Sequence, residues 1–328
     1  MVAALPRLPR FDGMGGVVLR RLLSLIPVLL VISVAAFSLV LLLPGDSAVA
    51  ALGPNPTAEQ IAAAHKALNL DQPAPVRYVQ WLGNALHGDL GVSVTTQRPV
   101  ASEIASRAPI TVAIAGFTLL AAGVLGTLLG VVQAVFANRL PDRILLGFVS
   151  LGLSIPNFWL ATLLVAFFAV KLGWFPAIGY VSPADSISDW AKHLVLPVLT
   201  LAVFPAAELA RQVRTGLVDV LDKEYIRAAR ARGLSSLRVI GKHALKNAAG
   251  PALTIFGLRV GYLLAGSVIV ENIFVMPGLG AYTLAAIQNH DATVIQAMVL
   301  ISAVIVVACN LAVDLLYMVL NPRVRVSA

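Results

Sequence analysis

Four ionisable residues lie in or close to long hydrophobic segments of this chain: Glu208, Arg259, Glu271 and Asp314. A charged side chain is costly in an apolar surrounding, so such residues usually face a bundle interior, a water-filled cavity or a partner charge. We expect them either to line the path of a polar solute or to pair within a bundle. Arg259 and Glu271 are no obvious pair, because twelve residues place them about 18 Å apart along one helix.

Residue types that support covalent or metal chemistry are sparse. The five histidines show no metal-ligand spacing, and the single cysteine, Cys309, lies in a hydrophobic run. No G-x-S-x-G turn presents a serine nucleophile. The phosphate-binding pattern G-x-x-x-x-G-K-[ST] is also absent, because Ser236 replaces its first glycine and His243 follows Lys242. We therefore expect no catalytic residue, metal site, cofactor or nucleotide site in this chain.

The densest charge lies in residues 211–250. Apolar residues at helical spacing predict a first helix with one apolar face, formed by Leu217, Leu221, Tyr225, Ala228 and Ala229. Gly233 is expected to end that helix, and Ser235 or Ser236 can begin a second one. Two interpretations stay open: a hairpin lying on a membrane surface, or a docking element that fits a groove of another protein.

The composition indicates an integral membrane protein. Hydrophobic residues make up 59% of the 328 residues and charged residues only 12%, against about 25% charged residues in soluble domains. The net charge of +8 does not indicate nucleic-acid binding, because no basic patch is interleaved with aromatic residues for base stacking. The basic residues cluster next to hydrophobic segments instead.

Six hydrophobic segments predict an all-α fold of about six transmembrane helices. Four segments carry no charge and are long enough to span a bilayer: 22–43, 108–138, 144–170 and 292–313. Two weaker ones are the short segment 193–207 and the segment 247–270, which contains Arg259. Segment 22–43 is too long for a signal-peptide core and is expected to be retained. Pro156 and Pro197 are expected to bend their helices.

The basic residues predict the orientation. With the N-terminus inside, 17 of the 24 Lys and Arg residues fall in cytoplasmic segments and six in outer segments, as the positive-inside rule requires. Both termini are then cytoplasmic, in segments 1–21 and 321–328. Residues 44–107 form a long extracytoplasmic loop, in which 57–70 could be a short helix capped by Thr57.

Residues 224–234 carry a resemblance to a known family. The sequence from Glu224 through Ala228, Ala229 and Gly233 to Leu234 resembles the EAA loop of binding-protein-dependent ABC importer permeases. Further motifs resemble those of the dipeptide/oligopeptide/nickel permeases, although a basic residue usual near Pro44-Gly45-Asp46 is missing. These motifs are Pro44-Gly45-Asp46, Gly88-Asp89-Leu90-Gly91, Ser154-Ile155-Pro156-Asn157, Glu271-Asn272-Ile273-Phe274, Pro277-Gly278-Leu279-Gly280 and Asn321-Pro322-Arg323.

The resemblance implies a type I ABC importer permease whose core spans residues 108–320. Its partners would be a second homologous permease, cytoplasmic ATPases that bind ATP and Mg²⁺, an extracytoplasmic binding protein and membrane lipid. Glu224, Ala228, Ala229, Gly233 and Leu234 would couple the permease to the ATPase. The cargo would be dipeptides or oligopeptides, and a glutathione or nickel-chelate importer is the alternative. An ion-coupled secondary transporter is a further alternative, against which the lack of visible inverted repeats counts.

Overall fold

The computed structural model describes residues 14–42, 57–59, 71–246, 248 and 259–320. In these residues the regular elements are helices, with one isolated β-bridge between Val92 and Pro99. Three of the described helices are long and apolar enough to span a membrane, or four if a bent pair counts as one span. Two shorter apolar helices fall in the predicted segments 22–43 and 247–270. The all-helical fold is confirmed, whereas six spans stay a prediction.

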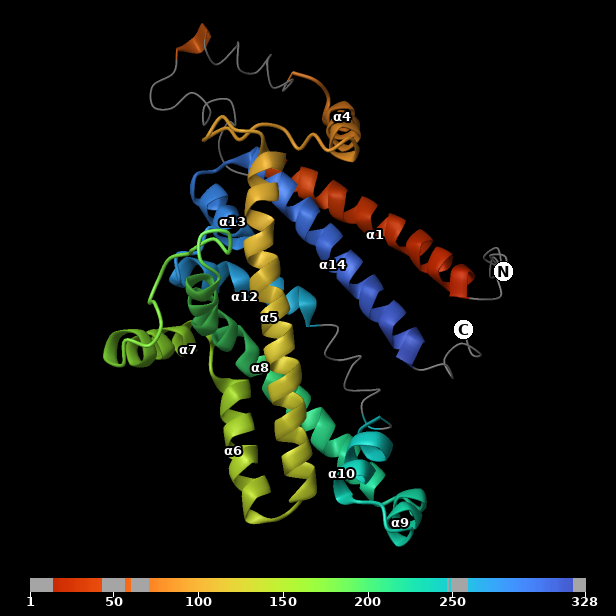
Figure 1. The fold of residues 1–328 in the computed structure, drawn as a ribbon. Helices are drawn as coiled ribbons and strands as arrows, with labels where there is room; N and C mark the ends of the chain where they lie inside the picture. Colours follow the sequence, from red (N-terminus) through yellow and green to blue (C-terminus); the bar gives the residue numbers. More distant parts are fainter. Residues whose placement is uncertain (1–13, 43–56, 60–70, 247, 249–258, 321–328) are drawn as a thin grey trace.

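Two long helices, α5 (Val100–Val135) and α8 (Ile187–Leu221), lie side by side through the centre of the fold (Figure 1). Each extends beyond the uncharged segment that predicted it. α8 in particular runs on past segment 193–207 at both ends, and it continues through Pro197. The charged residues at its ends therefore belong to the same helix as the apolar middle.

Two glycines of α5 set the distance between this helix pair. A Cβ atom at Gly130 would lie 2.6 Å from the carbonyl oxygen of Ala210, and one at Gly126 would lie 2.7 Å from that of Ala206. Such distances leave no room for any side chain. Small residues four apart on both helices allow the close backbone approach that favours helix association in membranes.

Pro156 divides one predicted span into two helices. The segment 144–170 was predicted to be a helix bent at Pro156, and the bend is confirmed. Three consecutive elements take its place: α6 (Leu140–Ser154), α7 (Asn157–Leu164) and the π-helix η1 (Val165–Lys171). The chain bends by 109° at the break. Ile155 has an extended backbone, with φ −77° and ψ 123°, because the proline ring disfavours a helical conformation in the preceding residue.

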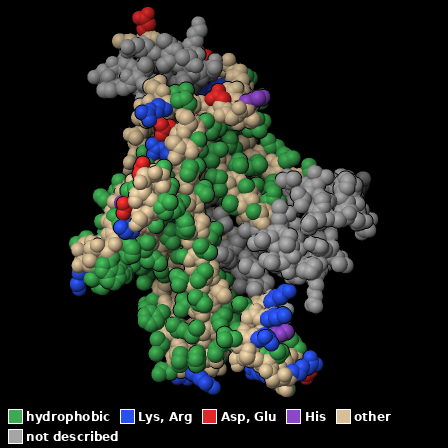
Figure 2. All heavy atoms as spheres, viewed as in Figure 1, with side chains coloured by type: hydrophobic (Ala, Val, Ile, Leu, Met, Phe, Trp, Pro, Cys, Tyr) green, Lys and Arg blue, Asp and Glu red, His purple; other side chains and the backbone are tan. Residues whose placement is uncertain are grey.

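The two ends of the described chain pack together. α1 (Met14–Leu42) lies along α14 (Ala292–Leu320) in Figure 1. A hydrogen bond of 2.8 Å between the hydroxyls of Ser33 and Tyr78 joins α1 to α4 (Ala74–Leu86). Hydrophobic side chains cover much of the visible surface in Figure 2. In a membrane, lipid would contact such a surface, because contact of apolar side chains with water is unfavourable.

Helices α12 (Val260–Ile273) and α13 (Leu279–Gln288) complete the core. Leu263 of α12 packs in one buried cluster with Ile114 of α5 and Leu196 of α8. The part of the predicted segment 247–270 that precedes α12 lies mostly outside the described residues. The predicted helix 57–70 also lies outside them beyond its first residues. Three short elements follow α8: α9 (Glu224–Ala231), α10 (Ser236–Arg238) and the π-helix η2 (Val239–Ala244).

A buried ion pair holds α8 to the turn between α5 and α6. Asp142 is 1% exposed, and its carboxylate accepts hydrogen bonds from Nε and Nη2 of Arg214 at 2.8 and 2.6 Å. It also accepts the backbone N–H of Asn138, whose φ is 65°. This turn and α9 lie at the same end of the molecule in Figure 1, which we call the hairpin end. α4 and α13 lie at the opposite end.

Replacing Gly130 with alanine should lower the free energy of unfolding by about 1–3 kcal/mol, because the added Cβ overlaps the Ala210 carbonyl oxygen. Thermal unfolding of the purified protein in detergent would show a lower midpoint. Gly116→Ala is the matched control, since Gly116 lies on the same helix and a Cβ there meets nothing within 4 Å. Equal midpoints for the two variants would contradict the close approach of α5 and α8.

Arg214→Gln should destabilise the protein by about 3 kcal/mol, because it leaves the buried Asp142 carboxylate without its counter-charge. The double variant Asp142→Asn/Arg214→Gln should recover part of that loss, which the same thermal assay measures. Lys192→Gln removes the exposed pair of α8 with Asp189 and should cost less than about 1 kcal/mol. A double variant that is no more stable than Arg214→Gln alone would show that the pair does not act as a unit.

Candidate functional site

The segment that follows α8, residues 222–246, forms a hairpin of short helices that we call the basic hairpin. α8 ends at Leu221, and α9 begins only at Glu224. Between them Lys223 is extended, with φ −70° and ψ 147°. The sequence predicted one helix through this point, and that prediction is wrong. The break lets α9 turn away from the direction of α8.

Ile226 anchors α9 to the rest of the protein. Its side chain is fully buried in a cluster that includes Val213 and Leu217 of α8 and Val239 and Ala244 of η2. Tyr225 and Ala228, which the sequence placed on the apolar face, are exposed, and Ala229 is half-buried against the cluster. The predicted apolar face is therefore wrong in part, because the break at Lys223 changes which side of α9 packs.

Gly233 ends α9 as predicted. Its φ is +78°, in the left-handed region that favours glycine. Its N–H donates to the carbonyl oxygen of Arg230 at 2.9 Å, and the N–H of Leu234 donates to that of Ala229 at 3.4 Å. These are the paired hydrogen bonds of a Schellman motif. Leu234 and Ala229 also pack against the Ile226 cluster, so Gly233 turns the chain back onto the same support.

The exposed surface of the basic hairpin combines apolar and cationic groups. Leu237 is 87% and Tyr225 47% exposed, and lysine, arginine and histidine side chains gather at this end in Figure 2. Glu224 is the first residue of α9, is exposed, and makes no ion pair with another described residue. Its charge suits the positive end of that helix. Such a surface can dock into an apolar cleft with an acidic rim.

Two of the four ionisable candidates form a pair. Arg259, at the start of α12, donates two hydrogen bonds from Nε and Nη2 to the carboxylate of Glu208 on α8. The Arg259 guanidinium also lies 5.7 Å from the centre of the Phe204 ring, and that ring stacks on Tyr262 at 5.0 Å. Pairing within the bundle was one of the two outcomes expected for these residues.

Glu271 lies in a separate network at the end of α12. Its fully buried carboxylate accepts hydrogen bonds from the hydroxyl of Thr111 at 2.7 Å and from the N–H of Ala281 at 2.9 Å. The Thr111 oxygen accepts in turn from the N–H of Leu279 at 2.8 Å. A Cβ at Gly278 would lie 2.5 Å from the carboxylate. Glycine there leaves space for a carboxylate that holds the start of α13. Asp314 has its side chain outside the described residues.

At the end opposite the hairpin, the loop before α5 lies against the start of α14. Asp291, 2% exposed, caps α14 by accepting the N–H of Val294 at 3.2 Å. Its other carboxylate oxygen accepts the hydroxyls of Ser93 at 2.6 Å and Thr95 at 2.9 Å. A Cβ at Gly91 would lie 2.9 Å from the Thr293 methyl group. The loop motif Gly88-Asp89-Leu90-Gly91, which carries part of the family resemblance, thus makes a structural contact with α14.

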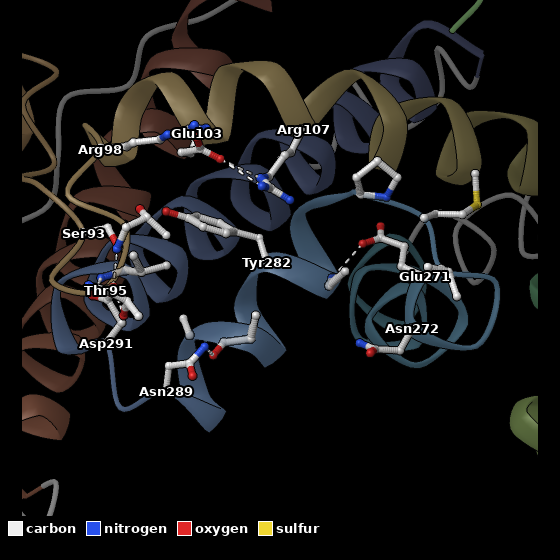
Figure 3. A pocket seen from close by; sticks show the side chains of 18 residues that line it. Ser93, Thr95, Arg98, Glu103, Arg107, Glu271, Asn272, Tyr282, Asn289 and Asp291 are labelled. Carbon is white, nitrogen blue, oxygen red and sulfur yellow. Dashed lines mark hydrogen bonds and ion pairs between the residues drawn. The ribbon is translucent and has the colours of Figure 1, made fainter. Parts of the chain in front are cut away.

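A cavity of about 720 Å³ opens beside this loop, and we call it the Tyr282 pocket (Figure 3). The loop, the start of α5 and helix α13 surround it. Its polar lining includes Ser93, Thr95, Arg98, Arg107, Tyr282 and Asn289. This volume falls in the usual range of small-molecule sites, about 300–1,000 Å³.

Tyr282 stands at the centre of this pocket. The Arg107 guanidinium lies over its ring, 4.8 Å from the centroid, while Nε and Nη2 of Arg107 bond to Glu103 at 3.1 and 2.9 Å. The Tyr282 hydroxyl has no hydrogen-bond partner among the described residues. Burial raises the pKa of Tyr282 to about 12, and the charges of Asp291 and Glu103 act in the same direction. The hydroxyl therefore stays a proton donor at neutral pH.

Sequence reasoning missed the Asp142–Arg214 pair, Asp291 and Tyr282. Asp291 stands directly before the segment 292–313, where aspartate is a favoured N-cap, so the capping pattern could have found it. Asp142 and Arg214 are 72 residues apart, and no local spacing links them. A single tyrosine such as Tyr282 carries no motif at all.

Comparisons with known proteins cover nearly the whole chain. A family model described as "Binding-protein-dependent transport system inner membrane component" matches residues 126–326, and the model of its N-terminal part matches residues 14–115. A peptide transport system permease protein of Brucella abortus (strain 2308) is 40% identical over 95% of this chain and 99% of its own length. The glutathione transport system permease protein GsiC of Escherichia coli (strain K12) is 42% identical over 94% and 98%.

Solved structures share the fold. An inward-facing structure of the MetNI methionine ABC transporter aligns with a TM-score of 0.54 and 20% identity, over 67% of this chain and 96% of that one. A second crystal form gives 0.53 and 21%, over 64% and 93%. About two thirds of this chain therefore shares its fold with these transporter structures. The chain belongs to the binding-protein-dependent ABC importer permeases, the multi-pass inner membrane components of these transport systems.

Proposed function

We propose that this chain is the permease subunit of an ATP-driven importer of peptides. The basic hairpin carries the proposal, because an exposed, rigidly anchored element at one end of the bundle suits the docking of an energy-supplying partner. The relatives named for peptide and for glutathione transport support the cargo class. Glutathione is itself a tripeptide derivative, so both names point to small peptide-like solutes.

The proposed coupling site is the basic hairpin. Cytoplasmic ATPase subunits, which bind ATP and Mg²⁺, would receive Tyr225, Leu237 and the exposed Ala228 in a cleft. Glu224 would hold the start of α9 or pair with the ATPase. Ala229, Gly233 and Leu234 would act from the inside by fixing α9 onto α8. Movement of the ATPases would then reach the membrane helices directly, since Ile226 packs on α8.

The hairpin end would face the cytoplasm, with both chain termini on that side. The Tyr282 pocket would then face the extracytoplasmic binding protein. A second, homologous permease would complete the path between the two faces. Among the residues proposed to line the translocation path, Glu208 and Arg259 are held by each other and by aromatic rings. Glu271 is instead held by a backbone N–H group. Asp314 remains a candidate on sequence grounds.

Uptake of a labelled dipeptide tests the function. The chain would be reconstituted in proteoliposomes with its second permease, ATPases and binding protein. We expect uptake with ATP on the hairpin side, and none with ADP or with a proton gradient alone. Uptake that follows the proton gradient without ATP would instead identify a secondary transporter.

Gly233→Pro should abolish uptake while the complex still assembles and hydrolyses ATP. Proline fixes φ near −65°, far from the observed +78°, and removes the N–H that bonds to Arg230. The ratio of peptide transported to ATP hydrolysed is the measurement. Gly233→Ala should reduce the ratio less, because left-handed backbone costs alanine about 1–2 kcal/mol.

Gly241→Ala is the matched control for the hairpin. Gly241 lies in η2, and a Cβ there meets nothing within 4 Å. This variant should keep the ratio of the unmodified protein. Normal coupling in Gly233→Pro, or equal loss in Gly241→Ala, would count against a coupling role for the α9 turn.

A further inference from the structure

The carboxylates around the Tyr282 pocket are already satisfied by the protein. Asp291 accepts hydrogen bonds from Ser93, Thr95 and the start of α14. Glu271, which also lines the pocket, accepts from Thr111 and Ala281. Glu103 accepts from Arg107 through one oxygen and from Arg98 through the other, at 3.2 Å. An additional cation in the pocket would therefore compete with existing donors. The acidic residues here do not indicate a cation site.

The pocket groups that still lack a hydrogen-bond partner among the described residues are donors instead. Tyr282 is 7% exposed, and its buried hydroxyl lacks a partner among the described residues. Buried tyrosine hydroxyls usually find an acceptor. Arg98 is 71% exposed at its side chain and uses only Nη1 in its bond to Glu103. Arg107 uses Nε and Nη2, which leaves Nη1 without a described partner.

Two of these donor groups lie on one side of the pocket. Figure 3 shows the Tyr282 hydroxyl directed toward the side of the pocket where Ser93 and Arg98 lie, with Arg107 above the ring. A planar group with two acceptor oxygens can bond to a guanidinium and to the phenol at once. Phenol and guanidinium donors together can therefore bind a group with two acceptor oxygens, such as a carboxylate.

We propose that the Tyr282 pocket is an entry site that binds the terminal carboxylate of a peptide, an inference that rests on the proposed function. The cavity of about 720 Å³ has room for the rest of a short peptide. A carboxylate on the surface of a docked protein is the other possible source of this group. The depth of the Tyr282 hydroxyl favours a small ligand that enters the cavity whole.

The test uses the assembled transporter in lipid nanodiscs without its binding protein. Radiolabelled Ala-benzoylphenylalanine-Ala is cross-linked by light, and the labelled residues are mapped by mass spectrometry. We expect label on residues of the Tyr282 pocket. Trialanine should compete about tenfold better than trialanine amide, because amidation removes the charge that strengthens the hydrogen bonds.

Tyr282→Phe and Arg98→Gln should each reduce that preference for the free acid severalfold. Tyr282→Phe removes only a hydroxyl without a described partner, so its thermal midpoint should not fall. Tyr180→Phe is the matched control, because Tyr180 does not line the pocket; it should keep the full preference.

Three results would overturn the inference: label outside the pocket, equal competition by acid and amide, or an unchanged preference in Tyr282→Phe. In a second sample that includes the binding protein, pocket residues that cross-link only to that protein would assign the carboxylate to it and also reject the proposal. ATP-driven uptake is measured in parallel. Its absence would reject the proposed function, whereas normal uptake with an unlabelled pocket would reject this inference alone.

Discussion

Between Gly130 and the carbonyl oxygen of Ala210 there is no room for a methyl group, and α6, α7 and α12 pack against the same helix α8. Lipid is as apolar as a leucine side chain, so burial of apolar surface does not drive helices together within a membrane. Close packing of backbones has to do so. α6 follows the same rule, since a Cβ at Gly152 would lie 3.1 Å from Val203 of α8. α8 is thus the common support of its neighbours.

The two candidate sites lie at opposite ends of this helix pair. α8 leads into the basic hairpin, and the buried Asp142–Arg214 pair fixes that end to the α5–α6 turn. α5 begins beside the Tyr282 pocket and supplies Glu103 and Arg107 to it. Tightly packed interiors transmit displacement with little compression. A force on the hairpin would therefore be transmitted to both helices.

The sequence predicted local features well. Gly233 ends a helix because its backbone needs a positive φ, and Pro156 interrupts one because its ring excludes helical geometry before it. Both effects act within a few residues. The importer family could also be recognised from motifs. The Glu208–Arg259 pair and the network of Glu271 were not predictable in detail, since partners 51 and 160 residues apart meet only through the fold. The sequence also predicted the wrong buried face for α9. Burial of Ile226 against α8 outweighs the apolar periodicity that runs through Tyr225.

The contacts within the α5–α8 pair and those with its neighbours differ in kind. This difference indicates which contacts cost the least free energy to break. The Gly126 and Gly130 contacts are steric, so any rotation there meets backbone atoms. α12 meets α8 through the Glu208–Arg259 pair. α12 also packs on α8 through apolar contacts, since a Cβ at Gly266 would lie 3.0 Å from Leu201. It also meets α7 through a hydrogen bond of 3.2 Å from Asn157 to the Tyr262 hydroxyl. Polar contacts can be exchanged for water or solute at small net cost, because one hydrogen bond replaces another. The polar contacts of α12 with α7 and α8 could therefore be exchanged during a movement, whereas the backbone contact between α5 and α8 blocks rotation there.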